Sequence, residues 1–290
     1  MPAAPDVDPL SILSRLEALG IKLGLERARS VLAAMGEPQR RFPAVLVAGT
    51  NGKGSTSAFL AAIARAAGYR TGLYTSTHLE QVEERLQIDG RRIEPGRFGQ
   101  ILEGLVALAE RETGAPLTYF EAVTLAAFQW FAEEAVDLAV VEVGLGGRLD
   151  ATNLCDPILS LITPIGFDHQ EFLGDTLASI AREKAGILRP GRMGLVWIEE
   201  PEAAESVRQA AVELGADLRF ASKEVRIEEV VPEGWTGQRV RLATPLRSYD
   251  LRIALLGAHQ VINLGLAVRA AEVLAELGFD RISLGAIQEG

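Results

Sequence analysis

The sequence predicts an α/β protein with a mostly parallel sheet flanked by helices and a small antiparallel sheet appended near residues 224–256. Short apolar runs alternate with helical stretches along most of the chain, which is the order that a parallel sheet requires. A glycine-rich segment, 49–54, stands between a predicted strand and a predicted helix. The chain has 290 residues, of which 48% are apolar and 23% charged. This composition favours a globular protein with a sizeable core.

The main sheet and its helices are predicted from the spacing of apolar residues. Short apolar runs bounded by turn residues are expected to be buried strands; these are 44–48, 70–75, 138–143, 158–163 and 194–198. Stretches with apolar residues at helical spacing are expected to be helices; these are 9–20, 26–35, 55–67, 95–110, 120–134, 176–188 and 202–214.

The last quarter of the chain has a different pattern. Three strand-like runs, 225–231, 238–243 and 249–255, are separated by Pro, Gly and Thr, which predicts a small antiparallel sheet. A long amphipathic helix is expected over 259–277, and residues 282–290 have the pattern of a helix that begins.

Charge and leader patterns exclude several classes of protein. The net charge is −10, whereas a protein that binds along a nucleic-acid backbone usually carries the opposite sign. The N-terminus lacks a basic and apolar leader, and no apolar run reaches the roughly 18–20 residues that span a bilayer. The single cysteine, Cys155, cannot form an internal disulfide, which fits a reducing compartment. We therefore expect a cytoplasmic protein with neither a nucleic-acid nor a membrane partner.

The strongest signal for chemistry is the segment Gly49-Thr50-Asn51-Gly52-Lys53-Gly54-Ser55. A glycine-rich turn that opens a helix can hold a phosphate with backbone N–H groups, the helix dipole and a lysine. In the standard P-loop a Gly is followed by four residues and Gly-Lys-Ser/Thr. Here Val47 stands at the first Gly, and Gly54 separates Lys53 from Ser55. The segment predicts a variant P-loop and hence a P-loop-type sheet; the alternative is a glycine-rich turn with a surface lysine.

This seven-residue string resembles the nucleotide loop of the Mur ligase superfamily, and more closely that of its folate branch, the folylpolyglutamate and dihydrofolate synthases. The extra Gly54 is the form of that branch. Further segments resemble the family in the same order along the chain; these are 21–27, 75–79 with 84–85, 118–121, 142–153, 163–174, 183–187 and 257–260 with 263. The resemblance spans nearly the whole sequence.

The resemblance implies an ATP site with two Mg²⁺ ions and three catalytic residues, Lys53, His169 and Lys184. Lys53 would offset phosphate charge, and Ser55 would share the first Mg²⁺ with Glu142. A carboxylate at the end of a buried strand is costly without a metal or hydrogen-bond partner, although a paired structural glutamate is the alternative. His169 matches a ligand of the second Mg²⁺. Lys184 matches a lysine that is typically carbamylated in the family, which would reverse its charge; an ordinary surface lysine is the alternative.

The resemblance also assigns substrate and nucleotide contacts outside the loop. Thr118, Phe120 and Ala151 match the surface that meets the pterin and benzoyl groups, although a phenylalanine at a helix start is often part of the core. Gln260 and Asn263 match the family's nucleotide-side helix, with helix capping as the alternative.

The activity that the resemblance implies is ATP-dependent amide ligation. A dihydropteroate or (tetrahydro)folate carboxylate would become an acyl phosphate and then be joined to L-glutamate. The alternatives are a non-catalytic nucleotide-binding module and a Mur-type ligase for a peptidoglycan precursor. Residues 1–290 would form one ATP-binding central domain of a monomer, and the family's C-terminal domain would be absent. We therefore expect an incomplete ligase fragment.

Overall fold

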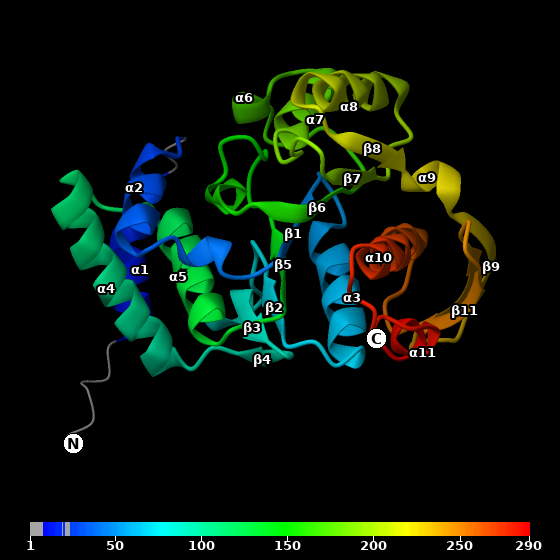
Figure 1. Ribbon diagram of the computed structural model, residues 1–290, viewed down its shortest axis with the longest axis horizontal. Helices are drawn as coiled ribbons and strands as arrows, with labels where there is room; N and C mark the ends of the chain where they lie inside the picture. Colours follow the sequence, from blue (N-terminus) through cyan, green and yellow to red (C-terminus); the bar gives the residue numbers. More distant parts are fainter. Residues whose placement is uncertain (1–7, 19, 21–23) are drawn as a thin grey trace.

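An eight-stranded sheet lies at the centre of the protein (Figure 1). The computed structural model describes residues 8–18, 20 and 24–290, so residues 21–23 of the predicted opening segment lie outside it. The sheet order is β4-β3-β2-β5-β1-β6-β7-β8. The strands are β1 (Ala44–Ala48), β2 (Thr71–Tyr74), β3 (Leu86–Ile88), β4 (Arg91–Arg92), β5 (Leu138–Glu142), β6 (Pro157–Ile162), β7 (Met193–Val196) and β8 (Asp217–Phe220). Neighbours from β2 to β8 are parallel, and β3 and β4 pair antiparallel at one edge, which confirms the predicted mostly parallel sheet.

Helices cover both faces of this sheet. The α-helices are α1 (Pro9–Glu17), α2 (Glu26–Ala34), α3 (Lys53–Ala66), α4 (Pro95–Thr113), α5 (Tyr119–Glu133), α6 (Gln170–Leu173), α7 (Leu177–Ala185), α8 (Pro201–Leu214), α9 (Ala221–Glu224), α10 (Ala258–Glu276) and α11 (Leu284–Glu289). The 3₁₀ helices are η1 (Pro38–Arg40), η2 (Val82–Arg85) and η3 (Ala151–Leu154). In Figure 1, α1, α2, α4 and α5 lie to the left of the sheet, and α3 and α10 lie to its right. Within the described part of the chain, no helix combines the length and apolarity needed to cross a membrane.

The central strand β1 shows why the parallel strands are continuous apolar runs. Leu46 contributes to the hydrophobic core that contains α4 and α5 residues, whereas Val45 and Val47 contribute to the core that contains α3 and α10 residues. All five β1 residues are buried. A parallel strand that is covered on both faces needs an apolar side chain at each position.

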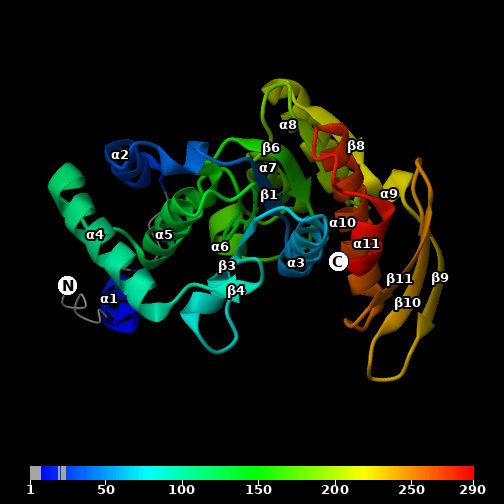
Figure 2. The same cartoon turned by 60° about the horizontal axis from the view of Figure 1, so that its bottom comes forward.

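A separate three-stranded antiparallel sheet lies beside α10 and confirms the prediction for residues 224–256 (Figure 2). Its strands are β9 (Arg226–Pro232), β10 (Gln238–Ala243) and β11 (Ser248–Ile253), in the order β11-β10-β9. A buried polar network ties it to α10. Glu272 accepts hydrogen bonds from Thr244 Oγ1 at 2.7 Å and Tyr249 Oη at 2.8 Å. Arg269 on the same helix pairs with Glu272 at 3.2 Å and with Glu224 at 2.6 Å.

Besides the three 3₁₀ helices, the structure contains five short strands and α-helices that the sequence pattern does not predict, namely β3, β4, β8, α6 and α9. Two of them are the edges of the sheet: β4 is a pair of exposed arginines, and β8 is the partly exposed segment Asp217–Phe220. The helix after the glycine-rich turn begins at Lys53 rather than at the expected residue 55.

The buried network predicts a large loss of stability for Arg269→Ala. This change leaves Glu272, which is 4% exposed, without its cation. Removing one partner of a buried ion pair costs about 3–5 kcal/mol, and we expect the free energy of unfolding to fall by that amount in urea titrations. The exposed Arg226→Ala variant is the matched control and should change it by less than about 0.5 kcal/mol. Equal losses in the two variants would contradict the assigned role of the network.

Candidate functional site

The glycine-rich loop lies where β1 ends and α3 begins, at the carboxyl edge of the sheet. Gly49 and Gly52 have positive φ angles of 146° and 85°. A Cβ at Gly49 would lie 1.8 Å from Thr163 Oγ1, and a Cβ at Gly52 would lie 2.1 Å from Asn263 Oδ1. Both positions therefore require glycine. No side chain in the described part of the chain caps the N-terminus of α3, so its first N–H groups are free to hold an anion.

Hydrogen bonds hold this loop against the segment after β6. The backbone N–H groups of Thr50 and Asn51 donate to Pro164 O at 3.1 and 3.4 Å. The Thr50 hydroxyl donates to Gly166 O and accepts from Gly166 N, both at 3.0 Å. The neighbouring strands β1 and β6 thus bring the two loops of the predicted site together.

Two lysine ammonium groups meet at one backbone carbonyl of the loop. Lys184 Nζ donates to Gly49 O at 2.8 Å, and Lys53 Nζ donates to the same oxygen at 3.1 Å and to Thr50 O at 3.0 Å. Lys184 is only 4% exposed, so it is not the ordinary surface lysine of the alternative interpretation. Burial, followed by repulsion from Lys53, lowers the pKa of Lys184 to about 8. Its neutral amine is therefore about two orders of magnitude more populated near neutral pH than that of a free lysine.

Glu142 is a buried carboxylate beside the loop. It is the last residue of β5 and is 4% exposed. Its Oε2 accepts a hydrogen bond from Ser76 N at 2.9 Å and would lie 3.5 Å from a Cβ on Gly54. Among the described residues it has no cationic side-chain partner. A buried carboxylate without a cation, beside the helix turn that carries Gly54 and Ser55, suits Mg²⁺, which prefers oxygen ligands, so the donor types fit the predicted first metal ion.

His169 lies on the loop that the Thr50–Gly166 bonds hold in place. It has a left-handed backbone with φ 48°, and its Nε2 is 3.6 Å from Asp168 Oδ1. Its side chain is 52% exposed. Within the described ranges, no contact joins it to Glu142, and no three His, Cys, Asp or Glu side chains gather as a metal centre. The second Mg²⁺ site therefore stays a prediction.

The start of α10 lies against the loop, which its second turn contacts through Asn263. Asn263 is buried, contacts the position of Gly52 and donates from Nδ2 to Gln260 Oε1 at 3.0 Å. The backbone N–H of Gln260 donates to Gly257 O. Both residues predicted for the nucleotide side are thus near the loop, although the Gln260–Asn263 hydrogen bond also stabilises the helix start.

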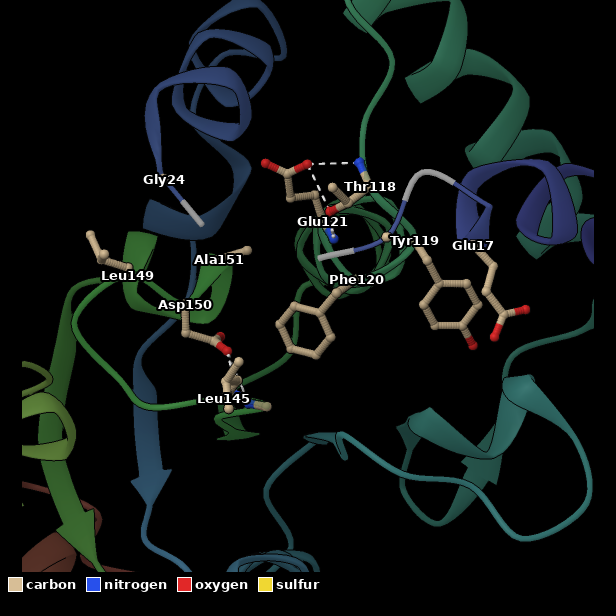
Figure 3. Close-up of a pocket in the computed structure, with 12 residues that line it drawn as sticks. Glu17, Gly24, Thr118, Tyr119, Phe120, Glu121, Leu145, Leu149, Asp150 and Ala151 are labelled. Atoms are coloured by element: carbon tan, nitrogen blue, oxygen red, sulfur yellow. Dashed lines mark hydrogen bonds between the residues drawn. The ribbon is translucent and has the colours of Figure 1, made fainter. Parts of the chain in front are cut away.

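The three residues predicted to contact substrate line one cavity of about 290 Å³ (Figure 3). They are Thr118, Phe120 and Ala151. The Phe120 ring points into the cavity, opposite Asp150 and Leu145. Its tip also packs on the backbone of Gly144, where a Cβ would lie 2.4 Å away.

Two buried carboxylates shape this cavity. Glu121 Oε2 accepts from Thr118 N and Thr118 Oγ1, at 2.7 and 2.9 Å, and pairs with Arg27 at 2.7 Å. Thr118 therefore caps α5, and its hydroxyl group donates its proton to Glu121 rather than to a ligand. Asp150 Oδ2 accepts from the N–H groups of Gly144 and Leu145. Burial raises the pKa of Asp150, and these hydrogen bonds oppose the rise.

Several further lining residues were not named as substrate contacts, among them Glu17, Tyr119 and Leu149. Tyr119 and Leu149 lie within the segments 118–121 and 142–153 that carry the resemblance, whereas Glu17 lies outside them. Glu121 had a local signal, because a threonine followed three residues later by a glutamate is a capping box. Glu17 had none, because it reaches the cavity from a helix more than 100 residues away in sequence. Cys155 is buried as expected, and burial raises the pKa of its thiol to about 12.

The segment after β5 packs closely on the end of α7, which carries Lys184. A Cβ on Gly147 would lie 2.8 Å from Glu183 O and 2.9 Å from Lys184 O. Arg189 also joins the end of this segment to the residues that follow α7. Its Nη2 donates to Asn153 Oδ1 at 2.7 Å and to Cys155 O at 3.2 Å, while Nη1 donates to three carbonyls that follow α7. Backbone packing thus fixes the position of Lys184.

Comparison with known proteins gives a consistent family. The family described as Mur ligase middle domain matches residues 47–271. The dihydrofolate synthase/folylpolyglutamate synthase of Bacillus subtilis is 38% identical over 279 residues, covering 93% of this chain and 64% of that protein. The chain spans less than two thirds of the length of the first curated relatives that it matches.

Solved structures agree with this result. The Mycobacterium tuberculosis folylpolyglutamate synthase complexed with ADP is 33% identical with a TM-score of 0.86, over 98% of this chain and 67% of that one. The Escherichia coli FolC in complex with DHPP and ADP is 33% identical with a TM-score of 0.82, over 99% and 67%.

The pKa of Lys184 predicts a specific dependence of stability on pH. Between about 8 and the ordinary lysine value of 10.5 the unfolded chain binds the proton and the folded chain does not. Stability contributed by Lys184 therefore rises with pH through this window, by about 3 kcal/mol in total. Urea titrations in carbonate-free buffer should show that Lys184→Met removes the rise. The exposed Lys223→Met variant should retain it, and an unchanged pH profile in Lys184→Met would refute the assignment.

Proposed function

The chain belongs to the folylpolyglutamate and dihydrofolate synthase branch of the Mur ligase family, and we propose that its site joins L-glutamate to a dihydropteroate or (tetrahydro)folate carboxylate at the expense of ATP. The observation that carries the proposal is the short span between two sites. Glu142, beside the nucleotide loop, and Gly144, on the wall of the aromatic cavity, are two residues apart. This is about 7 Å of extended chain.

The proposed reaction has two steps. The carboxylate of the bound pterin compound attacks the γ-phosphorus of ATP, which forms an acyl phosphate and releases ADP. The amino group of glutamate then attacks the acyl carbon, the amide bond forms, phosphate leaves and the amine loses a proton. The chemistry needs positioning and neutralisation of negative charge more than it needs covalent catalysis.

The chain's own groups supply that positioning. Lys53 and the free N–H groups of α3 hold the phosphates, and the wall that contains Phe120 holds the ring of the pterin compound. Glu142 and Ser55 would hold one Mg²⁺, and His169 a second. When bound, Mg²⁺ would supply neutralisation of the phosphate charge. Gln260 and Asn263 support the loop from the nucleotide side.

We also propose carbamylation of Lys184. Because the pKa of Lys184 is lowered, more of its amine is unprotonated, and the nitrogen lone pair can attack CO₂. A C–N bond then forms, and a proton leaves the nitrogen. The product is an anion, so the repulsion between Lys184 and Lys53 becomes an attraction. An intact mass that is higher by one CO₂ and that returns to the unmodified value on acidification would support the modification.

The central test is ATP-dependent incorporation of glutamate into dihydropteroate and tetrahydrofolate. We expect Lys53→Ala and Glu142→Gln each to lower the rate by about 100-fold or more, because each removes a group that neutralises phosphate charge or holds its metal ion. Lys223→Ala, at an exposed site on α9, is the control and should keep the rate.

Nucleotide binding, measured separately by equilibrium dialysis, identifies the cause of a negative result. ATP binding without turnover of any substrate is also the result expected of an incomplete ligase fragment, so the assay is repeated with a relative's C-terminal half added in trans. Turnover restored in this way would support the ligase, and its continued absence would favour a non-catalytic nucleotide module. Turnover only with muramoyl substrates would favour a peptidoglycan-precursor ligase.

The cavity assignment predicts that Phe120→Ala weakens dihydropteroate binding by about 10-fold, because an apolar wall and an aromatic contact are lost. Phe120→Leu should give a smaller loss, and ATP affinity should stay unchanged in both. Trp235→Ala removes an aromatic ring that is 96% exposed, on the β9–β10 turn, and should have no effect. Calorimetric titration measures all three variants; an unchanged dihydropteroate affinity in Phe120→Ala would place the pterin elsewhere.

A further inference from the structure

A second and larger cavity, of about 780 Å³, lies at the opposite edge of the sheet. It is lined by residues that precede strands: Phe42 and Pro43 lead into β1, Asp156 leads into β6, and Arg192 leads into β7. The nucleotide loop, in contrast, follows β1. The five residues of β1 separate the two edges by about 17 Å, so this cavity is distinct from the site described above.

Arginine dominates the wall of this cavity. Five of the thirteen lining residues are arginines and one is acidic; the arginines are Arg29, Arg40, Arg41, Arg189 and Arg192. In a chain of net charge −10, this is a local concentration of positive charge. Such a concentration attracts anions and loses strength as salt screens it.

Most of these guanidinium groups lack a close carboxylate. Arg29 and Arg41 form no ion pair within the described residues, and Arg41 Nη2 donates only to Gly36 O at 3.1 Å. Arg192 is 3.8 Å from Asp156, and Arg40 Nε is 3.4 Å from Glu37 Oε2. Arg189 directs its N–H groups to backbone carbonyls and is held rigidly by them. The cavity therefore has positive charge that the chain itself does not neutralise.

One buried polar group on this wall also lacks a partner. Gln39 is 4% exposed, and its Nε2 donates to Glu37 Oε2. Its Oε1 has no hydrogen-bond partner among the described residues. An unpaired buried acceptor is costly, and a rotation of the Gln39 amide toward the cavity would let a ligand that carries an N–H donor relieve that cost.

These features define the chemistry of a ligand. Guanidinium groups recognise carboxylate and phosphate groups through paired N–H donors. Several such groups around a cavity of this size suit a linear polyanion rather than one small ion. A polyphosphate offers oxyanions alone, whereas an oligo-γ-glutamyl chain offers a carboxylate at each unit together with amide N–H donors.

We infer that this cavity is an accessory site for an oligo-γ-glutamyl chain. The choice of this polyanion rests on the proposed function, which would produce such chains. Arg29 and Arg41, which form no ion pair among the described residues, bind its carboxylates, and its amide N–H groups donate to Gln39 Oε1. Because the cavity lies at the edge opposite the nucleotide loop, a chain bound there is held by the protein without being in the reacting position.

The test is calorimetric titration of the protein with free tetra-γ-glutamate and, separately, with inorganic tripolyphosphate, at low and at physiological salt. We expect saturable binding of tetra-γ-glutamate that is tighter than binding of tripolyphosphate. Arg29→Glu/Arg41→Glu should weaken this binding by about 10-fold or more, because two positive charges on the cavity wall become negative. Both side chains are exposed, so the fold should be unchanged. Arg226→Glu/Arg252→Glu makes the same charge change on the small sheet, where both side chains are 77% exposed, and should leave affinity within about twofold.

Each other outcome overturns part of the inference. Tighter binding of tripolyphosphate, lost in the same Arg29/Arg41 variant, would make the ligand a polyphosphate. Equal losses in the two double variants, or absence of binding at low salt, would refute the site. The measurement does not depend on ligase activity. Binding of tetra-γ-glutamate by a protein that ligates no glutamate, even with a relative's C-terminal half added in trans, would refute the proposed function and leave the polyanion site standing.

Discussion

The site depends on two ammonium groups that share the carbonyl oxygen of Gly49. Lys53 reaches this oxygen from the first turn of α3, and Lys184 reaches it from the end of α7. Their repulsion, added to burial, lowers the pKa of Lys184. The arrangement persists because close backbone packing fixes α7, together with the ion pair of Arg148 with Glu183 at 2.8 Å. Gly147 lies so close to Glu183 O that even a methyl group would collide there.

The lack of counterions on each side of the loop explains why a metal–phosphate pair suits this place. The loop carries lysines and uncapped N–H groups that lack an anion, while the buried carboxylate of Glu142 lacks a cation in the described part of the structure. A phosphate alone would answer the first need and repel Glu142. A metal ion alone would answer the second and repel the lysines. A metal ion bound together with a phosphate supplies both counterions. The metal ion also offsets the repulsion between the phosphate and a protein of net charge −10.

How much the sequence could predict depends on how local the signal is. The buried strand β1 was predicted to the residue, because burial on both faces leaves a continuous apolar run. The loop and the cavity residues Thr118, Phe120 and Ala151 were found through contiguous motifs. The edge strand β4 was missed because two exposed arginines carry no periodic pattern, and β8 because its four residues are too few to show one clearly. The arginine cavity was missed because its residues come from four separate segments that only the folded sheet edge brings together.

The segment from Glu142 to Asn153 limits what the site can accept. It begins at the nucleotide loop, forms the cavity wall beside Phe120 and ends on the arginine that braces α7. Asp150 ties its turn through the N–H groups of Gly144 and Leu145, so the distance from wall to loop is set by hydrogen bonds within one short stretch. A ligand that bridges the two must then carry its carboxylate at a fixed distance from its ring. A rigid aryl carboxylate meets that condition with less loss of conformational freedom than a flexible chain.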